Sequence, residues 1–269
     1  MMKCTKNIIL TAAGILVYNC DKSNNAFTGL NTSTDTVATI NTAIANGSLR
    51  YLPFLKASDA ISANNEDGTS VTDQEDTIQV SSARIGITAM LNSRFGSLMK
   101  ASKINGAVMG YVVTKEGFIV GQPSADGSTL DMVKIEVSMP SPLPNSAFAG
   151  SNMPNVQVAI NFGKVEVVEG WRLRAFSGIN SAEDLLELEI ADLVPLTTTT
   201  AKIVDFLGET ITGANDVSDA SFVYSSGSAH TATISSGIIT FTTTAADEVV
   251  TCEGSISGYA ITKPIVMPS

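Results

Sequence analysis

Histidine, cysteine and tryptophan are scarce in this 269-residue chain, which has one His, three Cys and one Trp. A hydrolytic triad requires a histidine beside a nucleophile and an acid, and no Gly-x-Ser-x-Gly elbow accompanies His230. A zinc site requires clustered His and Cys residues, which the sequence also lacks. The composition therefore predicts a protein that is not an enzyme and that uses no metal or cofactor.

Charge is also sparse, because Asp, Glu, Lys and Arg together make up 16% of the residues. The 26 acidic residues outnumber the 16 basic ones, which gives a net charge of −10. Neutralising DNA phosphates requires clustered basic side chains, so these scattered ones argue against an extended DNA-binding face. A glycosidase would need two facing carboxylates beside sugar-binding aromatic residues, and aromatic content is only 6%.

No apolar run is long enough to cross a bilayer, which requires about 20 residues. The longest amino-terminal run, Ile8–Val17, follows the weakly basic Met1–Lys6 and precedes Cys20, as in a bacterial lipoprotein signal. Tyr18 and Asn19, however, occupy the positions where cleavage requires small residues. We therefore expect a strand or arm that docks onto a neighbouring element, and a surface lipoprotein with a binding module stays an alternative.

The three cysteines form an odd set without the spacing of metal ligands. The separation of Cys4 and Cys20 is compatible with a disulfide, and Cys252 stands alone near the carboxyl end. We favour free cysteines that pack as small apolar residues in a protein made in a reducing cytoplasm. The sequence leaves open whether any of the three forms a disulfide.

Thr, Ser, Ala, Gly and Val are abundant, which favours β-structure, and the 44% apolar content is enough for a sizeable core. The alternation of apolar and polar residues predicts a strand over Thr77–Ile87. Helical spacing then predicts a short helix over Leu91–Lys103. A hairpin follows, with strands at Ala107–Val113 and Phe118–Val120, and Met132–Val137 gives another strand.

Weaker patterns predict further elements. Apolar residues spaced by three and four over Val37–Ile44 predict a short helix that ends near Gly47. Pro53 marks Leu49–Leu55 as an edge strand, and Gly163 marks a turn or bulge after Val156–Phe162. Additional strands are expected at Trp171–Phe176 and Asp184–Leu193, although Ser181 could instead begin a helix through a capping box.

An acidic loop extends from Asn64 to Asp76 and contains five carboxylates. Such density raises the hypothesis of a calcium site, but the acidic residues are not in the register of the twelve-residue calcium-binding loop. A solvated loop, or one that lines an electronegative surface, is the favoured interpretation.

The composition changes at Pro195–Thr200, which we interpret as an extended linker between domains 1–195 and 196–269. The second domain has two lysines, no arginine and seven acidic residues. Glycines separate short β-type runs there, which predicts a small β-sandwich of immunoglobulin-like build. The six predicted strands are Ile203–Leu207, Ser221–Tyr224, Thr231–Ile234, Ile238–Thr243, Glu248–Cys252 and Tyr259–Ile265.

The order of elements over residues 76–176 resembles the tail-tube proteins of tailed bacteriophages and related contractile injection devices. The resemblance rests on the strand Thr77–Ile87, the amphipathic segment Arg94–Lys100, the hairpin within Gly106–Gly121 and the strands that follow. Some members of that family carry an immunoglobulin-like domain at the carboxyl end. The fold class expected is therefore mainly β, with a β-sandwich or barrel-forming domain, one short helix and a smaller carboxyl-terminal β-sandwich.

The resemblance implies a structural protein of the virion, made in the host cytoplasm and located in the viral tail. Its subunits would form homohexameric rings that pool strands into one β-barrel, and the rings would stack through amino-terminal arms such as Ile8–Val17. DNA would pass nearby without specific binding, beside other virion proteins and away from any membrane. Closing a barrel across subunits would also cover exposed sheet edges. The alternative within the same class is a head-decoration, connector or fibre protein.

Overall fold

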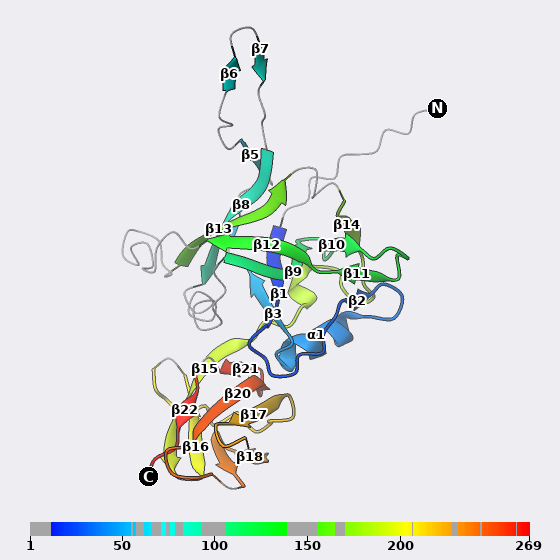
Figure 1. Cartoon of the computed structure of the whole chain (residues 1–269). Helices are drawn as coiled ribbons and strands as arrows, with labels where there is room; N and C mark the ends of the chain where they lie inside the picture. Colours follow the sequence, from blue (N-terminus) through cyan, green and yellow to red (C-terminus); the bar gives the residue numbers. More distant parts are fainter. Residues whose placement is uncertain are drawn as a thin grey trace.

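Figure 1 shows the computed structural model, which describes residues 12–54, 106–138, 155–164, 170–205, 207–227, 231–242, 244–261 and 263–269. It describes the backbone alone at 56–57, 62–65, 71–73, 76–78, 83–92, 106, 138, 155–159 and 162–164. Two large sheets and one small one account for the strands, and the only α-helix in these ranges is short. This confirms the predicted mainly β fold with sandwich or barrel character.

The first large sheet is organised around β9 (Gly106–Thr114). One side of β9 pairs with β1 (Ala12–Tyr18), and the other pairs with β10 (Ile119–Pro123) and β12 (Val133–Ser138). Gly110 shows this division directly, because it is the register partner of both Val17 on β1 and Val133 on β12. The sheet therefore divides into branches at β9, which brings several strands around a common interior.

The remaining strands extend these branches. Beyond β12 lie β13 (Asn155–Lys164), β8 (Ala83–Asn92), β4 (Lys56–Ala57) and β5 (Ser62–Asn65). Beyond β10 lie β14 (Arg172–Arg174), β11 (Thr129–Asp131) and β2 (Leu30–Asn31). Beyond β1 lies β3 (Leu49–Pro53), whose only partner among the described strands is β1, as expected for an edge strand.

β1 lies in the interior of its own chain. Ile15, Leu16 and Val17 are at most 1% exposed. Alternation along the strand sends Ile15 and Val17 into one apolar cluster and Leu16 into another on the opposite face. The predicted strand is confirmed, but docking of this segment on an adjacent ring is wrong for Ala12–Val17; residues 8–11 lie outside the described ranges.

The hairpin predicted after residue 106 is confirmed by β9 and β10. Gly117 has φ +79°, and its N–H donates to the carbonyl of Thr114 at 3.0 Å. The Thr114 hydroxyl accepts from the N–H of Phe118 at 3.1 Å, so side chain and backbone close the turn together. The strand β12 and the bulge at Gly163, where the register of β13 against β8 shifts, are also confirmed.

The short helix α1 (Val37–Ala45) covers the face of the first sheet that carries Leu16. Ile40 and Ile44 are fully buried there, in a cluster with Tyr111 from β9. The helix begins after Thr36, whose N–H donates to the Thr39 hydroxyl at 3.4 Å. It ends before Gly47, which adopts φ +76°, so the predicted helix and its terminus are confirmed.

Other predictions for the first half are corrected or lie outside the described residues. The helix expected over Leu91–Lys103 is wrong at its start, because Leu91 and Asn92 belong to β8, and residues 93–105 lie outside the described ranges. The strand expected over Thr77–Ile87 is described as β7 (Asp76–Ile78) and as the beginning of β8. The acidic side chains of 64–76, as well as Cys4 and His230, lie outside the described residues.

The second large sheet begins at β15 (Glu189–Thr197), which crosses the predicted boundary at 195/196. The segment interpreted as a linker is a β-hairpin, because β15 pairs with β16 (Thr200–Val204) and Thr197 is the register partner of Thr200. The extended-linker prediction is therefore wrong. Threonine is a strong β-former, so four consecutive threonines suit a hairpin.

The segment before β15 contains the 3-10 helix η1 (Ala182–Asp184), so the strand expected from Asp184 begins only at Glu189. The Ser181 hydroxyl accepts from the N–H of Glu183 at 3.3 Å, and Asp184 Oδ2 accepts from the N–H of Ser181 at 2.9 Å. The capping box noted in the sequence therefore forms, but it begins only a single turn of 3-10 helix.

Seven strands, all shorter than β15, complete the second sheet around one apolar cluster. They are β16, β17 (Ala220–Tyr224), β18 (Ala232–Ser235), β19 (Ile238–Phe241), β20 (Val249–Ile256), β21 (Tyr259–Ile261) and β22 (Ile265–Val266), in the order β17-β20-β21-β15-β16-β19-β18 with β22 beside β20. The ring of Phe241 on β19 makes edge-to-face contacts with Phe222 and Tyr224 on β17. Strands from opposite ends of the order therefore meet across the core, which is how this sheet curls.

Candidate functional site

The two large sheets meet where the end of α1 touches β20. A Cβ on Gly47 would lie 2.8 Å from the N atom of Gly254, and a Cβ on Gly254 would lie 3.2 Å from the carbonyl carbon of Asn46. Gly254 adopts φ +87°. The two backbones thus touch at a point where no side chain fits. We call this contact, formed by Asn46, Gly47 and Gly254, the glycine junction.

Polar contacts hold the two sheets together around the glycine junction. The N–H of Ser23 donates to Glu253 Oε1 at 2.8 Å. Asn41 on α1 accepts from the N–H of Leu186 at 2.7 Å and donates to the carbonyl of Asp184 at 3.1 Å, which fixes the segment that leads into β15. These contacts join residues distant in sequence, so they define how the sheets sit relative to each other.

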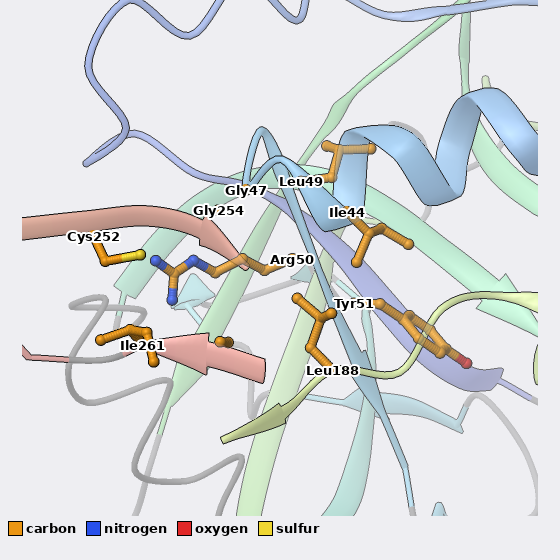
Figure 2. Close-up of a pocket in the computed structure, with 10 residues that line it drawn as sticks. Ile44, Gly47, Leu49, Arg50, Tyr51, Leu188, Cys252, Gly254 and Ile261 are labelled. Carbon is orange, nitrogen blue, oxygen red and sulfur yellow. The ribbon is translucent and has the colours of Figure 1, made fainter. Parts of the chain in front are cut away.

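A small cavity of about 20 Å³ lies beside the glycine junction (Figure 2). Arg50 on β3 lines it together with Cys252 on β20, and Figure 2 shows the Arg50 guanidinium directed toward Cys252. Burial lowers the pKa of Arg50, an effect that nearby Asp21 opposes. A cavity of this size holds about one water molecule, so it has no room for a substrate.

A larger hollow of about 470 Å³ opens on the second sheet between β15 and the turn after β16. Glu189 and Asp205 contribute its carboxylates. Asp205 Oδ1, however, accepts from the backbone N–H groups of Leu207 and Glu209 at 2.8 and 3.0 Å, so it stabilises a turn. The arrangement gives no pair of acids poised for proton transfer.

Buried titratable groups have structural partners. The Tyr111 hydroxyl donates to the carbonyl of Leu130 at 2.8 Å, and burial raises the pKa of this tyrosine. Burial also raises the pKa of Tyr224 to about 12, with a smaller contribution from Glu248. Within the described residues, no group of three or more His, Cys, Asp or Glu side chains is arranged to hold a metal ion.

The two described cysteines differ in reactivity. Cys20 is exposed, which contradicts its interpretation as a packed apolar residue, whereas Cys252 is buried as expected. Burial raises the pKa of Cys252 to about 12, so its thiol stays protonated and inaccessible at pH 8.

We therefore expect iodoacetamide at pH 8 to alkylate Cys20 and to leave Cys252 unmodified in the native protein. Mass spectrometry of the two cysteine-containing peptides measures this difference. Denaturation in urea before alkylation is the control and should label both residues. Rapid native labelling of Cys252 would show that the second core opens readily.

Unpaired strand edges are the most prominent surface feature. Among the described strands, β3, β14, β17 and β18 each have a hydrogen-bonded neighbour on one side only. An edge strand presents backbone N–H and C=O groups that can pair with another chain. Two of these edges expose a large apolar side chain, Leu173 on β14 (41% exposed) and Val223 on β17 (38% exposed).

The nested antiparallel pairs β5–β8 and β6–β7 are a second prominent surface feature. In the pairing of β5 with β8, Ser62 faces Gly86 and Asn65 faces Ala83. In the pairing of β6 (Val71–Asp73) with β7, Val71 faces Ile78. The β6–β7 pair therefore lies inside the β5–β8 pair in sequence and continues nearly the same antiparallel register. Among the described strands, β6 and β7 pair only with each other, and Figure 1 shows them beyond the body of the first sheet.

None of the described helices combines the length and apolar character needed to cross a membrane. A comparison with models of protein families finds no match, and a search of curated proteins finds no relative. We therefore infer function from the residues and the geometry of this chain.

The sequence predicted no catalytic, cofactor or metal residue. It also did not identify the exposed edge of β14 or the glycine junction. The Arg-Leu-Arg triplet of β14 was visible as a strand, but its position at an edge depends on the pairing of Ile119 with Arg174. The glycine junction gave no sequence signal, since the 21 glycines are spread through both halves of the chain. The one usable sequence signal was the placement of Leu173 between Arg172 and Arg174, because flanking charges indicate a strand that faces solvent.

Proposed function

We propose that this protein is a structural virion component, a tail tube subunit that assembles into stacked hexameric rings around a DNA conduit. The observation that supports this proposal best is the set of strand edges without a neighbour in the described part of the chain. Edges of this kind favour association, and a closed multi-subunit barrel covers them. The net charge of −10 suits a conduit, because an acidic wall does not retain DNA.

The hairpin that ends in β6 and β7 also supports assembly. A two-stranded hairpin is at best marginally stable in water, so it gains stability when a neighbouring subunit packs against it. In a stack of rings, such a hairpin suits contact with the next ring. We therefore propose β6 and β7 as the inter-ring contact, because Ala12–Val17 lie largely in the interior of their own chain.

The proposed role requires no chemistry from the protein, so we propose that it is not an enzyme. The cavity beside Arg50 is too small for a substrate. The alternative role, as a decoration, connector or fibre protein of the virion, uses the same edges but a different symmetry.

Negative-stain electron microscopy of the purified full chain tests the proposal. We expect rings or short tubes with a hollow centre and sixfold symmetry in class averages. Threefold or fivefold assemblies without a channel would favour a decoration, connector or fibre protein instead. Particles that stay single at every concentration and salt condition would contradict the proposal.

A further inference from the structure

We propose that β14 of one copy pairs with β17 of a neighbouring copy, so that the second sheet takes part in the assembly contact. This inference rests on the proposed self-assembly, and it assigns the contact between copies to these two strands. Both strands are edges of their sheets in the described structure, β14 beside β10 and β17 beside β20.

The two edges have complementary charge. β14 carries Arg172 and Arg174, which are two of the five arginines in the chain, and both are exposed. β17 itself has no charged residue, but the exposed Asp216 and Asp219 lie just before its first residue. The edge of β18, by contrast, has no charged residue within 231–242. Opposite charge steers association and fixes register, so it favours β17 over β18 as the partner of β14.

The two edges also complement each other in apolar surface. Leu173 lies between the two arginines and is 41% exposed. Val223 projects from β17 and is 38% exposed. All three residues of β14 are exposed. Pairing of the edges would bury both apolar side chains while satisfying backbone donors and acceptors.

The symmetry of such a contact has a consequence. Because β14 and β17 are different surfaces, a head-to-tail contact between them leaves one of each free on every pair of copies. Repetition of the contact therefore produces a ring if the rotation closes and a filament if it does not. A twofold dimer, in which each copy's β14 pairs with the other's β17, is the closed alternative and would stop at two copies.

Charge reversal on the full chain tests the pairing. We expect Arg174→Glu alone, and Asp219→Arg alone, to raise the protein concentration needed for half-assembly by about tenfold or more in low salt. The double variant should restore assembly, because it exchanges the two charges. Lys115→Glu and Glu209→Arg are the matched controls, since they make the same charge changes at exposed positions outside both edges.

Sedimentation velocity measures assembly, and circular dichroism verifies that each variant is folded. Restoration in the double variant, with both controls assembling normally, supports the pairing. If the wild-type protein assembles and the single reversals do not weaken it, or if the double variant fails to recover, the pairing is wrong while self-assembly stands. A wild-type protein that never assembles overturns the proposed function as well.

Discussion

Deletion of residues 2–18 should abolish the cooperative unfolding transition of the first sheet. This deletion removes β1, the strand that lies between β3 and β9. Ile15, Leu16 and Val17 are at most 1% exposed, and burying three such side chains contributes roughly 5–9 kcal/mol. A natural domain has a net stability of about 5–15 kcal/mol, so the loss is comparable to the whole.

Thermal unfolding followed by circular dichroism measures this effect. The matched control is a deletion of residues 2–11, which leaves every residue of β1 in place and should keep the cooperative transition. If the longer deletion unfolded at the wild-type temperature, β1 would not be part of the folded core. The experiment also tests the lipoprotein alternative, because processing before Cys20 would remove the same strand.

At the contact between the two sheets, we expect Gly254→Ala, which adds a single methyl group, to be strongly destabilising. A Cβ there would overlap the carbonyl oxygen of Asp219 and press on Asn46. Gly254 also has φ +87°, which costs an L-residue roughly 1–2 kcal/mol, and backbone overlap adds about 1–3 kcal/mol. We therefore expect a loss of about 2–5 kcal/mol in the free energy of unfolding, from the sum of these costs.

Gly258→Ala is the control for the backbone cost alone. Gly258 has φ +85°, almost the same as Gly254, but its Cβ would have no neighbour within 4 Å. Urea denaturation of the two variants should therefore separate the conformational cost from the cost of overlap with Asp219 and with the glycine junction. Equal destabilisation by the two substitutions would mean that the junction tolerates an added methyl group.

The features that could be predicted from the sequence are those set by neighbours in the chain. The hairpin between β9 and β10 follows from the alternation of residues 107–120 around Gly117. The helix α1 follows from apolar residues at Ile40 and Ile44, and the bulge in β13 from Gly163. In each case, side-chain period and turn chemistry act over a few residues, so the sequence contains the information.

The features that could not be predicted depend on pairing between distant segments. Alternation in Ala12–Tyr18 predicts a strand but does not say that it lies between β3 and β9. The threonines at 197–200 were interpreted as a linker because the composition changes there, and the sequence does not show that β15 pairs with β16. The edges β14 and β17 are identified by the absence of a second neighbour among the described strands, which the sequence alone does not reveal. The proposed assembly surfaces could therefore be identified only from the order of strands in the sheets.

The most direct test of the central claim is the sedimentation-equilibrium mass of the full chain over a range of protein concentrations. If copies complete one another's sheets, the mass should rise with concentration to multiples of 28.0 kDa, and sixfold the chain mass should dominate for the proposed ring. A mass that remained at 28.0 kDa up to the solubility limit would show that the edges need no partner. That result would contradict the account.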